Sequence, residues 1–222
     1  MRSTVRNAAV CGSGTDFKSK VCPVATWGMN MSKSLKGTKT EKNLLAAFAG
    51  ESQARNRYTY FSGAAKKEGL EQISAIFLET AENEKEHAKL FFKHLEGGDA
   101  EITASYPAGM IKTTLENLQS AAAGEKLEWT TLYKDFGKTA ADEGFPGVSK
   151  TFENVAKVEM FHEARYRKLI ENVSKKTVFT KPSAVKWHCR NCGMVLEGAE
   201  APEKCPACLH PRAYFELLAE NY

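Results

Sequence analysis

The sequence predicts a mostly α-helical protein, in which a four-helix bundle is followed by a small β/loop domain. Three observations lead to this prediction. Four segments of 26 to 30 residues lack proline and are rich in Ala, Leu, Glu and Lys. Glutamates and histidines recur in two matching sets within these segments. Finally, four of the six cysteines lie within Cys189–Cys208.

Glycines separate the four helical segments, and glycine commonly ends helices. The segments are Thr40–Lys67, Leu70–Leu95, Thr113–Asp142 and Val148–Val173. Short connections at Gly69 and Gly144 predict two antiparallel hairpins. The longer connection Gly97–Met110 contains Pro107 and predicts a crossover along the bundle.

An internal repeat relates the two hairpins. Three pairs of motifs recur in the same order: Gly50-Glu51 with Gly124-Glu125, Glu68-Gly69 with Glu143-Gly144, and Glu84-x-x-His87 with Glu159-x-x-His162. The spacing from the first glutamate to the Glu-x-x-His motif is 33 residues in one half and 34 in the other. This pattern indicates a duplicated helical hairpin.

The repeated charged residues lie where the apolar periodicity predicts a core, so we expect them to bind metal. Residues three or four apart project from the same face of a helix, and each Glu-x-x-His therefore offers an oxygen and a nitrogen ligand to one point. Buried carboxylates repel one another and lose hydration, which two metal ions would compensate. Histidine ligands favour a transition metal over calcium or magnesium. The predicted ligands are Glu51, Glu84, His87, Glu125, Glu128, Glu159 and His162.

Two further expectations concern the neighbours of these ligands. For Glu128, a surface position beside Trp129 is the alternative. Tyr58 and Tyr133 are candidates for hydrogen bonds to the carboxylates, although packing in the core would also explain them.

The cysteines predict a second metal site. Cys189 and Cys192 form one CxxC step, Cys205 and Cys208 form another, and two such steps can surround one tetrahedral ion. Structural zinc and redox-active iron both fit this pattern, and iron is favoured because a neighbouring oxidant-handling di-metal site needs electrons. We expect Lys175–Lys186 to be a linker.

Composition and boundaries restrict the remaining possibilities. The predicted domains are an N-terminal extension over residues 1–33, the bundle over 34–178 and the cysteine domain over 179–222. The extension is expected to be a disordered tail or an over-long reading frame, and an organelle transit peptide is the alternative. A net charge of +4 without a basic stripe argues against nucleic-acid binding, and no apolar run approaches the roughly 20 residues of a membrane span.

From about Ser34 to Tyr222 the chain resembles the rubrerythrin family in the order of its domains and in its motifs. The motifs are Gly50–Tyr58, Glu84–Lys89, Gly124-Glu125 with Glu128, Glu159–His162 and the two cysteine steps. The resemblance implies a ferritin-like di-iron domain joined to a rubredoxin-like domain. It also implies that the seven predicted ligands bind two iron ions per chain and form the catalytic site, and that the four cysteines bind one.

The resemblance further implies a function. Family members reduce hydrogen peroxide to water, usually in the cytoplasm, and so protect against oxidative stress. Rubredoxin or an NAD(P)H-dependent reductase would supply electrons through the cysteine centre, and a homodimer would form. Glu128 and His87 would be exchangeable ligands of one iron.

Two other functions stay open at the level of sequence. The same bundle could act as a ferroxidase that stores iron, with the cysteines as an accessory electron-transfer or zinc site. Alternatively, zinc in the cysteines would make the chain a metal-stabilised interaction module without turnover.

Overall fold

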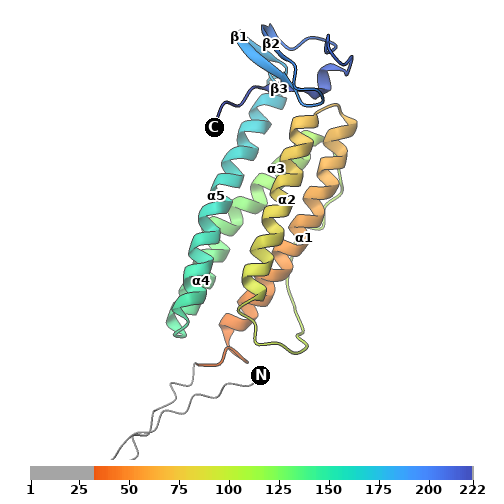
Figure 1. The fold of residues 1–222 in the computed structure, drawn as a ribbon. Coiled ribbons are helices and arrows are strands. Elements are labelled where there is room, and N and C mark those ends of the chain that lie inside the picture. Colours follow the sequence, from red (N-terminus) through yellow and green to blue (C-terminus); the bar gives the residue numbers. More distant parts are fainter. Residues whose placement is uncertain (1–32, 222) are drawn as a thin grey trace, which may run out of the picture. The chain divides into compact units, whose positions relative to one another are not determined.

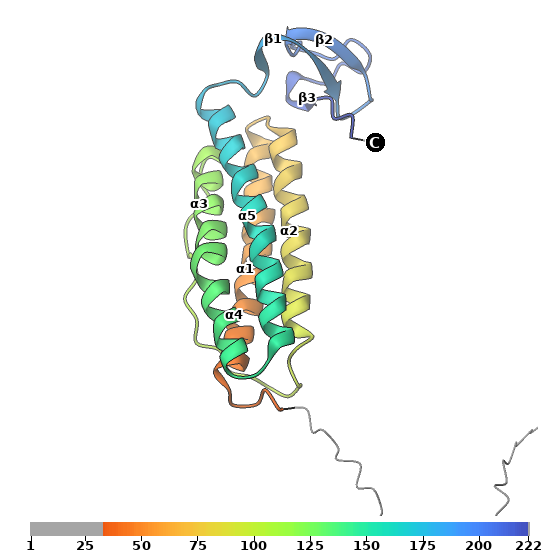
Figure 2. The ribbon, with the colours of Figure 1, turned by 90° about the vertical axis from the view of Figure 1, so that its left-hand side faces the viewer.

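The computed structural model describes residues 33–221, so the expectations for the N-terminal extension concern residues that are almost all outside the described part of the chain. Long helices dominate this part, as predicted. They are α1 (Lys39–Lys67), α2 (Glu71–Phe92), α3 (Thr114–Leu127), the π-helix η1 (Glu128–Leu132), α4 (Tyr133–Asp142) and α5 (Pro146–Ser174). The segments α3, η1 and α4 follow one another in a single column, which makes a bundle of four columns (Figures 1 and 2).

The ends of the helices follow from local chemistry. Thr38 caps α1 by accepting a hydrogen bond from the backbone of Glu41, and Thr113 forms a capping box with Glu116 at the start of α3. Gly69 and Gly144 adopt φ angles of 74° and 80°, which L-amino acids with a side chain rarely adopt. Both hairpins therefore turn at the predicted glycines.

The predicted helical segment Thr113–Asp142 is present, but it contains a π-turn over Glu128–Leu132 that was not predicted. The repeat explains the π-turn. Glu125 lies 74 positions after Glu51, but Tyr133 lies 75 positions after Tyr58. The second half therefore carries one extra residue between Glu125 and Tyr133. A π-turn accommodates one extra residue without ending the helix, and such turns are frequent at functional sites.

Two apolar clusters fill the bundle, and each contains repeat-related positions. The first is centred on Tyr58, Phe61, Phe77 and Tyr166, and the second on Tyr133, Phe136, Phe152 and Phe91. Along α1 and α2 the predicted ligands come between residues of one cluster and residues of the other. The charged centre is consequently enclosed by aromatic side chains from both sides.

A reciprocal pair of hydrogen bonds joins the two hairpins. The carboxylate of Glu68 at the end of α1 accepts from the backbone nitrogen of Thr114 at 2.8 Å, at the start of α3. The carboxylate of Glu143 at the end of α4 accepts from the backbone nitrogen of Thr40 at 2.8 Å, at the start of α1. Because the first amides of a helix lack partners within it, each hairpin completes a helix end of the other.

The C-terminal part forms a small antiparallel sheet. Its strands are β1 (Thr180–Cys189), β2 (Val195–Glu200) and β3 (Phe215–Leu217) in the order β2-β1-β3, and the short 3₁₀-helix η2 (Arg212–Tyr214) precedes β3. Trp187 and Phe215 are buried against Cys189 and Cys205 in its core. The expected linker Lys175–Lys186 is shorter than predicted, since β1 begins at Thr180. Pro182 is tolerated because the register shifts between Thr180 and Val185.

Within the part of the chain that the structure describes, no helix is both long and apolar enough to cross a membrane.

The turn between α4 and α5 can be tested with glycine substitutions. Gly144→Ala should lower the free energy of unfolding by about 1 kcal/mol, because a Cβ is unfavourable at positive φ. Gly63→Ala is the matched control: Gly63 lies inside α1 with open space around it, and alanine there should stabilise the helix by about 0.5–1 kcal/mol. Urea denaturation of both variants at equal iron content measures the difference. Equal effects of the two substitutions on the free energy of unfolding would contradict the positive φ angle of Gly144.

Candidate metal centres

Six of the seven predicted bundle ligands converge at one buried point. They form two overlapping groups, one of Glu51, Glu84, His87 and Glu159 and one of Glu84, Glu125, Glu159 and His162. Within each group the candidate ligand atoms all lie within 4.8 Å of one another. Glu84 and Glu159 belong to both groups, so both groups would share their carboxylates if each group held one ion.

The contacts between these groups resemble the lining of a metal site more than a hydrogen-bond network. Nδ1 of His87 lies 2.9 Å from Glu84 and 2.8 Å from Glu159. Nδ1 of His162 lies 2.7 Å from Glu159 and 3.2 Å from Glu84. Yet several of these buried atoms have no hydrogen-bond partner: Glu51 Oε2, Glu84 Oε1, Glu125 Oε2, both Glu159 oxygens and His162 Nδ1. Buried polar atoms are normally paired, and two cations would satisfy this set.

The pKa values of the buried glutamates and histidines also indicate that the site lacks positive charge. Burial and the charge of Glu84 raise the pKa of Glu51 well above its ordinary value, and raise that of Glu125 to about 8. Burial opposes ionisation of Glu84 as well, but its close contacts with the imidazoles of His162 and His87 lower its pKa to about 2. Burial also works against protonation of the histidines, yet the surrounding carboxylates raise the pKa of His87 to about 10 and that of His162 to about 12. These shifts show that the buried carboxylates favour positive charge beside them, from protons or from metal ions.

Neighbouring side chains orient the candidate ligands. The hydroxyl of Tyr58 donates to Glu125 Oε1 at 2.5 Å, and the hydroxyl of Tyr133 donates to Glu51 Oε1. The expected hydrogen bonds from both tyrosines are therefore confirmed, and they are repeat-related. Asn83 was not predicted: its Oδ1 lies 3.3 Å from Nε2 of His162, and an N–H donated from Nε2 leaves Nδ1 free to bind metal.

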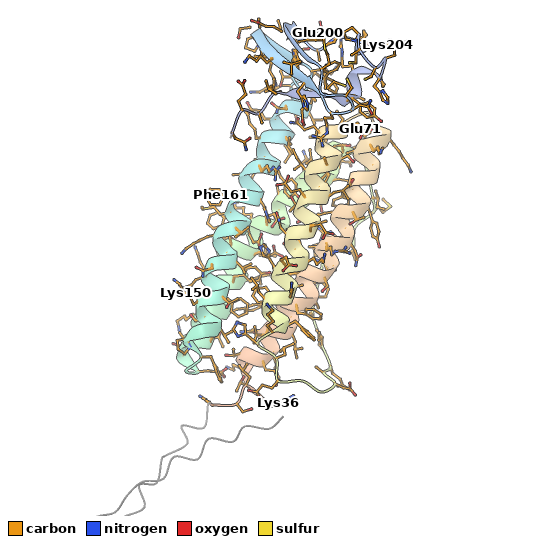
Figure 3. The ribbon with its side chains drawn as sticks, in the orientation of Figure 1. Lys36, Glu71, Lys150, Phe161, Glu200 and Lys204 are labelled. Carbon is orange, nitrogen blue, oxygen red and sulfur yellow. The ribbon has the colours of Figure 1, made fainter. Side chains whose placement is uncertain are left out.

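Glu128 differs from the other six. It begins the π-turn, is half-buried and belongs to neither converging group. Its carboxylate still lies near enough to the site to interact with it electrostatically. Burial first, and then the charges of Glu125, Glu159 and Glu84, raise the pKa of Glu128. Trp129 points elsewhere and donates its indole N–H to Glu163 at 2.6 Å. Phe161, beside His162, is exposed on α5 (Figure 3).

The four cysteines have the spacing of a tetrahedral metal site. All four are free, and Sγ–Sγ distances are 3.8 Å between Cys189 and Cys208 and 3.6 Å between Cys192 and Cys205. A tetrahedron of sulfurs at about 2.3 Å from a metal has edges of about 3.8 Å, whereas a disulfide is about 2.05 Å long. The two CxxC steps have the same backbone turn. The backbone nitrogen of Gly193 donates to the carbonyl oxygen of Cys189, and that of Leu209 donates to the carbonyl oxygen of Cys205, both at 2.9 Å.

A family model described as rubrerythrin matches residues 42–170, and one described as the rubrerythrin rubredoxin-like domain matches residues 187–216. The rubrerythrin of Porphyromonas gingivalis is 58% identical over 192 residues, which cover 86% of this chain and 96% of the relative. The chain belongs to the rubrerythrin family. The rubrerythrin of Nitratidesulfovibrio vulgaris is 56% identical over 190 residues, covering 86% of this chain and all of the relative.

Solved structures agree with this membership. A mixed-valence structure of nigerythrin has a TM-score of 0.55 at 30% identity and covers 85% of this chain and 90% of its own. A bacterioferritin from Desulfovibrio desulfuricans reaches 0.55 at 21% identity over 63% of this chain and 82% of its own, which shows the ferritin-like fold alone. As a rubrerythrin, the protein is an iron-dependent oxidoreductase with a di-iron centre in the bundle and a rubredoxin-like iron centre at the cysteines.

Removal of one carboxylate that both groups share should empty the bundle and spare the cysteine centre. Glu84→Ala should lower the iron content from about three ions per chain to about one, because Glu84 contributes to both groups and to no cysteine. Glu82→Ala is the control, since Glu82 lies on the same helix but is exposed and pairs with Arg55 and Lys85. Metal analysis and the visible spectrum measure both centres. An unchanged iron count in Glu84→Ala would refute the assignment.

Iron binding to the bundle should release protons at pH 7. His87, His162 and Glu125 have raised pKa values of about 10, 12 and 8 in the metal-free site and are therefore protonated, whereas metal ligands must lose their protons. Affinity should consequently fall as the pH decreases from 8 to 6. Anaerobic Fe(II) titration in weak buffer with a pH indicator measures the release, with the cysteine centre already filled. Iron binding without proton release would show that His87, His162 and Glu125 have already lost their protons before the metal binds.

Proposed function

We propose that the protein reduces hydrogen peroxide to water and that its seven predicted ligands hold the iron pair that does so. The ligands are Glu51, Glu84, His87, Glu125, Glu128, Glu159 and His162. One observation carries the proposal: a single chain combines a buried carboxylate–histidine centre with a four-cysteine centre suited to single-electron transfer. A protein that only stores iron has no need of the second centre.

The reaction consumes one peroxide, two electrons and two protons and yields two waters. Iron held by the bundle residues would supply the two electrons, and iron held by Cys189, Cys192, Cys205 and Cys208 would supply single-electron transfer to replace them. The protein supplies position and protons. The phenol pKa values of Tyr58 and Tyr133 are raised well above 10, first by burial, so at neutral pH both hydroxyls keep their protons and donate to Glu125 and Glu51.

The aromatic clusters limit the access of water to this centre. Phe91, Phe152 and Tyr133 close it on one side, and Tyr58, Phe77 and Tyr166 close it on the other. In such surroundings a hydrogen bond or charge acts more strongly than in water. A small oxidant that can reach the site is therefore favoured over a large substrate.

The partners form part of the same proposal. Electrons would come from a rubredoxin or from an NAD(P)H-dependent reductase, and the protein would act as a homodimer in the cytoplasm. The rubredoxin-like domain supports a role in electron transfer.

Loss of one cysteine should stop continuous turnover with peroxide but should leave the single reaction of the pre-reduced protein intact. Chemically reduced Cys205→Ser should still react once with peroxide, because the electrons of that reaction come from the bundle, but donor-driven turnover should fall by at least about a hundredfold. Ala207→Ser is the control: it adds the same hydroxyl within the same CxxC step and keeps all four thiols. Stopped-flow mixing and steady-state assays measure the two reactions.

Two outcomes would contradict the proposal. Undiminished turnover in Cys205→Ser would remove the cysteine centre from the electron path. A reduced wild-type site that reacts with dioxygen as fast as with peroxide would favour the ferroxidase and storage function.

A further inference from the structure

A cavity of about 320 Å³ lies on the face of the bundle between α1 and the α3–η1–α4 column. Small residues create it: Ala46, Gly50 and Ala54 on α1 and Gly124 on α3 leave space where larger side chains would close the helices together. Residues 103–107 of the crossover connection form its outer wall, and Tyr106 lies against Gly50, 3.8 Å from where a Cβ would stand. A water molecule occupies about 30 Å³ in the liquid, so a molecule as small as peroxide fits easily.

The inner wall of this cavity belongs to the di-iron centre. Glu128, Tyr58 and Tyr133 all line it, and the two tyrosines are those that bond to Glu125 and Glu51. A second cavity, between α4 and α5, also reaches Tyr133 but is lined by none of the seven predicted ligands. The half-burial of Glu128 is thus explained, since this carboxylate faces the cavity whereas the other six ligands are buried.

Arg57 gives the cavity a positive charge. Its Nη1 donates to Gln53 Oε1 at 3.3 Å, and Nη2 lies 4.0 Å from the position of a Cβ on Gly124. Both Arg57 and Gln53 line the cavity. Every other arginine within residues 33–221 forms an ion pair with a glutamate, whereas Arg57 forms none. A half-buried guanidinium with unused N–H donors is suited to hold a small oxygen-rich or anionic ligand.

We propose that this cavity is the access path to the di-iron centre and that Arg57 is a positioning residue, which holds the incoming oxidant by hydrogen bonds beside Glu128. The inference rests on the proposed peroxide reduction for its physiological ligand. It predicts in addition that small anions reach the iron by the same path, with Arg57 attracting them.

Two variants test the path. Arg57→Leu removes the charge and the donors, and Ala46→Phe fills the cavity from α1. Their controls are Arg55→Leu, which lies on the same helix but pairs with Glu82, and Ala141→Phe, which lines the cavity between α4 and α5. Iron content and the visible spectrum of the cysteine centre establish that each variant is loaded like the wild type.

The first measurement uses peroxide. A hydrogen bond to a charged group is worth about a factor of ten or more in binding. Arg57→Leu should therefore raise KM for peroxide at least about tenfold and change kcat less than about twofold, and Arg57→Lys should restore most of the loss. A purely structural role would lower kcat and iron content together and would overturn the inference.

The second measurement does not depend on turnover. Azide binding to the ferric protein, followed by its visible absorption, should weaken about tenfold in Arg57→Leu and should slow in Ala46→Phe, with both controls unchanged. Unchanged azide binding in both variants would overturn the inference even if the wild type reduces peroxide. If azide binding changes in the two variants as expected but the wild type does not reduce peroxide, the access path is supported and the proposed function is refuted.

Discussion

The structure depends on the cost of burying carboxylates. Glu51, Glu84, Glu125 and Glu159 are almost completely removed from water at the centre of the bundle, and only two histidines accompany them. Such a group of charges is stable only with protons or metal ions, and the oxygen and nitrogen atoms that lack partners show where those ions belong. The aromatic clusters on both sides make the charges more costly, and for the same reason they make the metal more tightly held.

The π-turn and the access cavity concern the same side of this centre. The extra residue of the second hairpin is accommodated by the π-turn that begins at Glu128. The repeat-related position in the first hairpin is Ala54, so the first hairpin has no matching carboxylate. The duplicated bundle is consequently symmetric in six ligands and asymmetric in the seventh. The asymmetry places a half-buried carboxylate at the cavity, where a ligand that changes its contacts during a reaction would be most useful.

Most of the fold and the convergence of six candidate ligands could be predicted because apolar periodicity and the repeat constrain them jointly. The π-turn was missed although the spacings of 33 and 34 residues contain its signal, since a one-residue difference also fits a slightly longer helix. Asn83 and Arg57 could not have been found in this way. Their roles depend on which partner each side chain has, and a sequence does not show that Arg55 is paired while its neighbour Arg57 is not.

The reciprocal caps have a consequence for the origin of the bundle. Because Glu68 completes the start of α3 and Glu143 completes the start of α1, the surface by which one hairpin recognises the other is nearly the same on both. Two identical hairpins would meet in the same way about a two-fold axis. Such a pair already contains two glutamates and two Glu-x-x-His motifs, so an ancestral peptide half as long could have enclosed two metal ions by self-association. Once two such copies are joined in one chain, each half can change independently, and the carboxylate of Glu128 opposite Ala54 is a difference that only a joined chain allows.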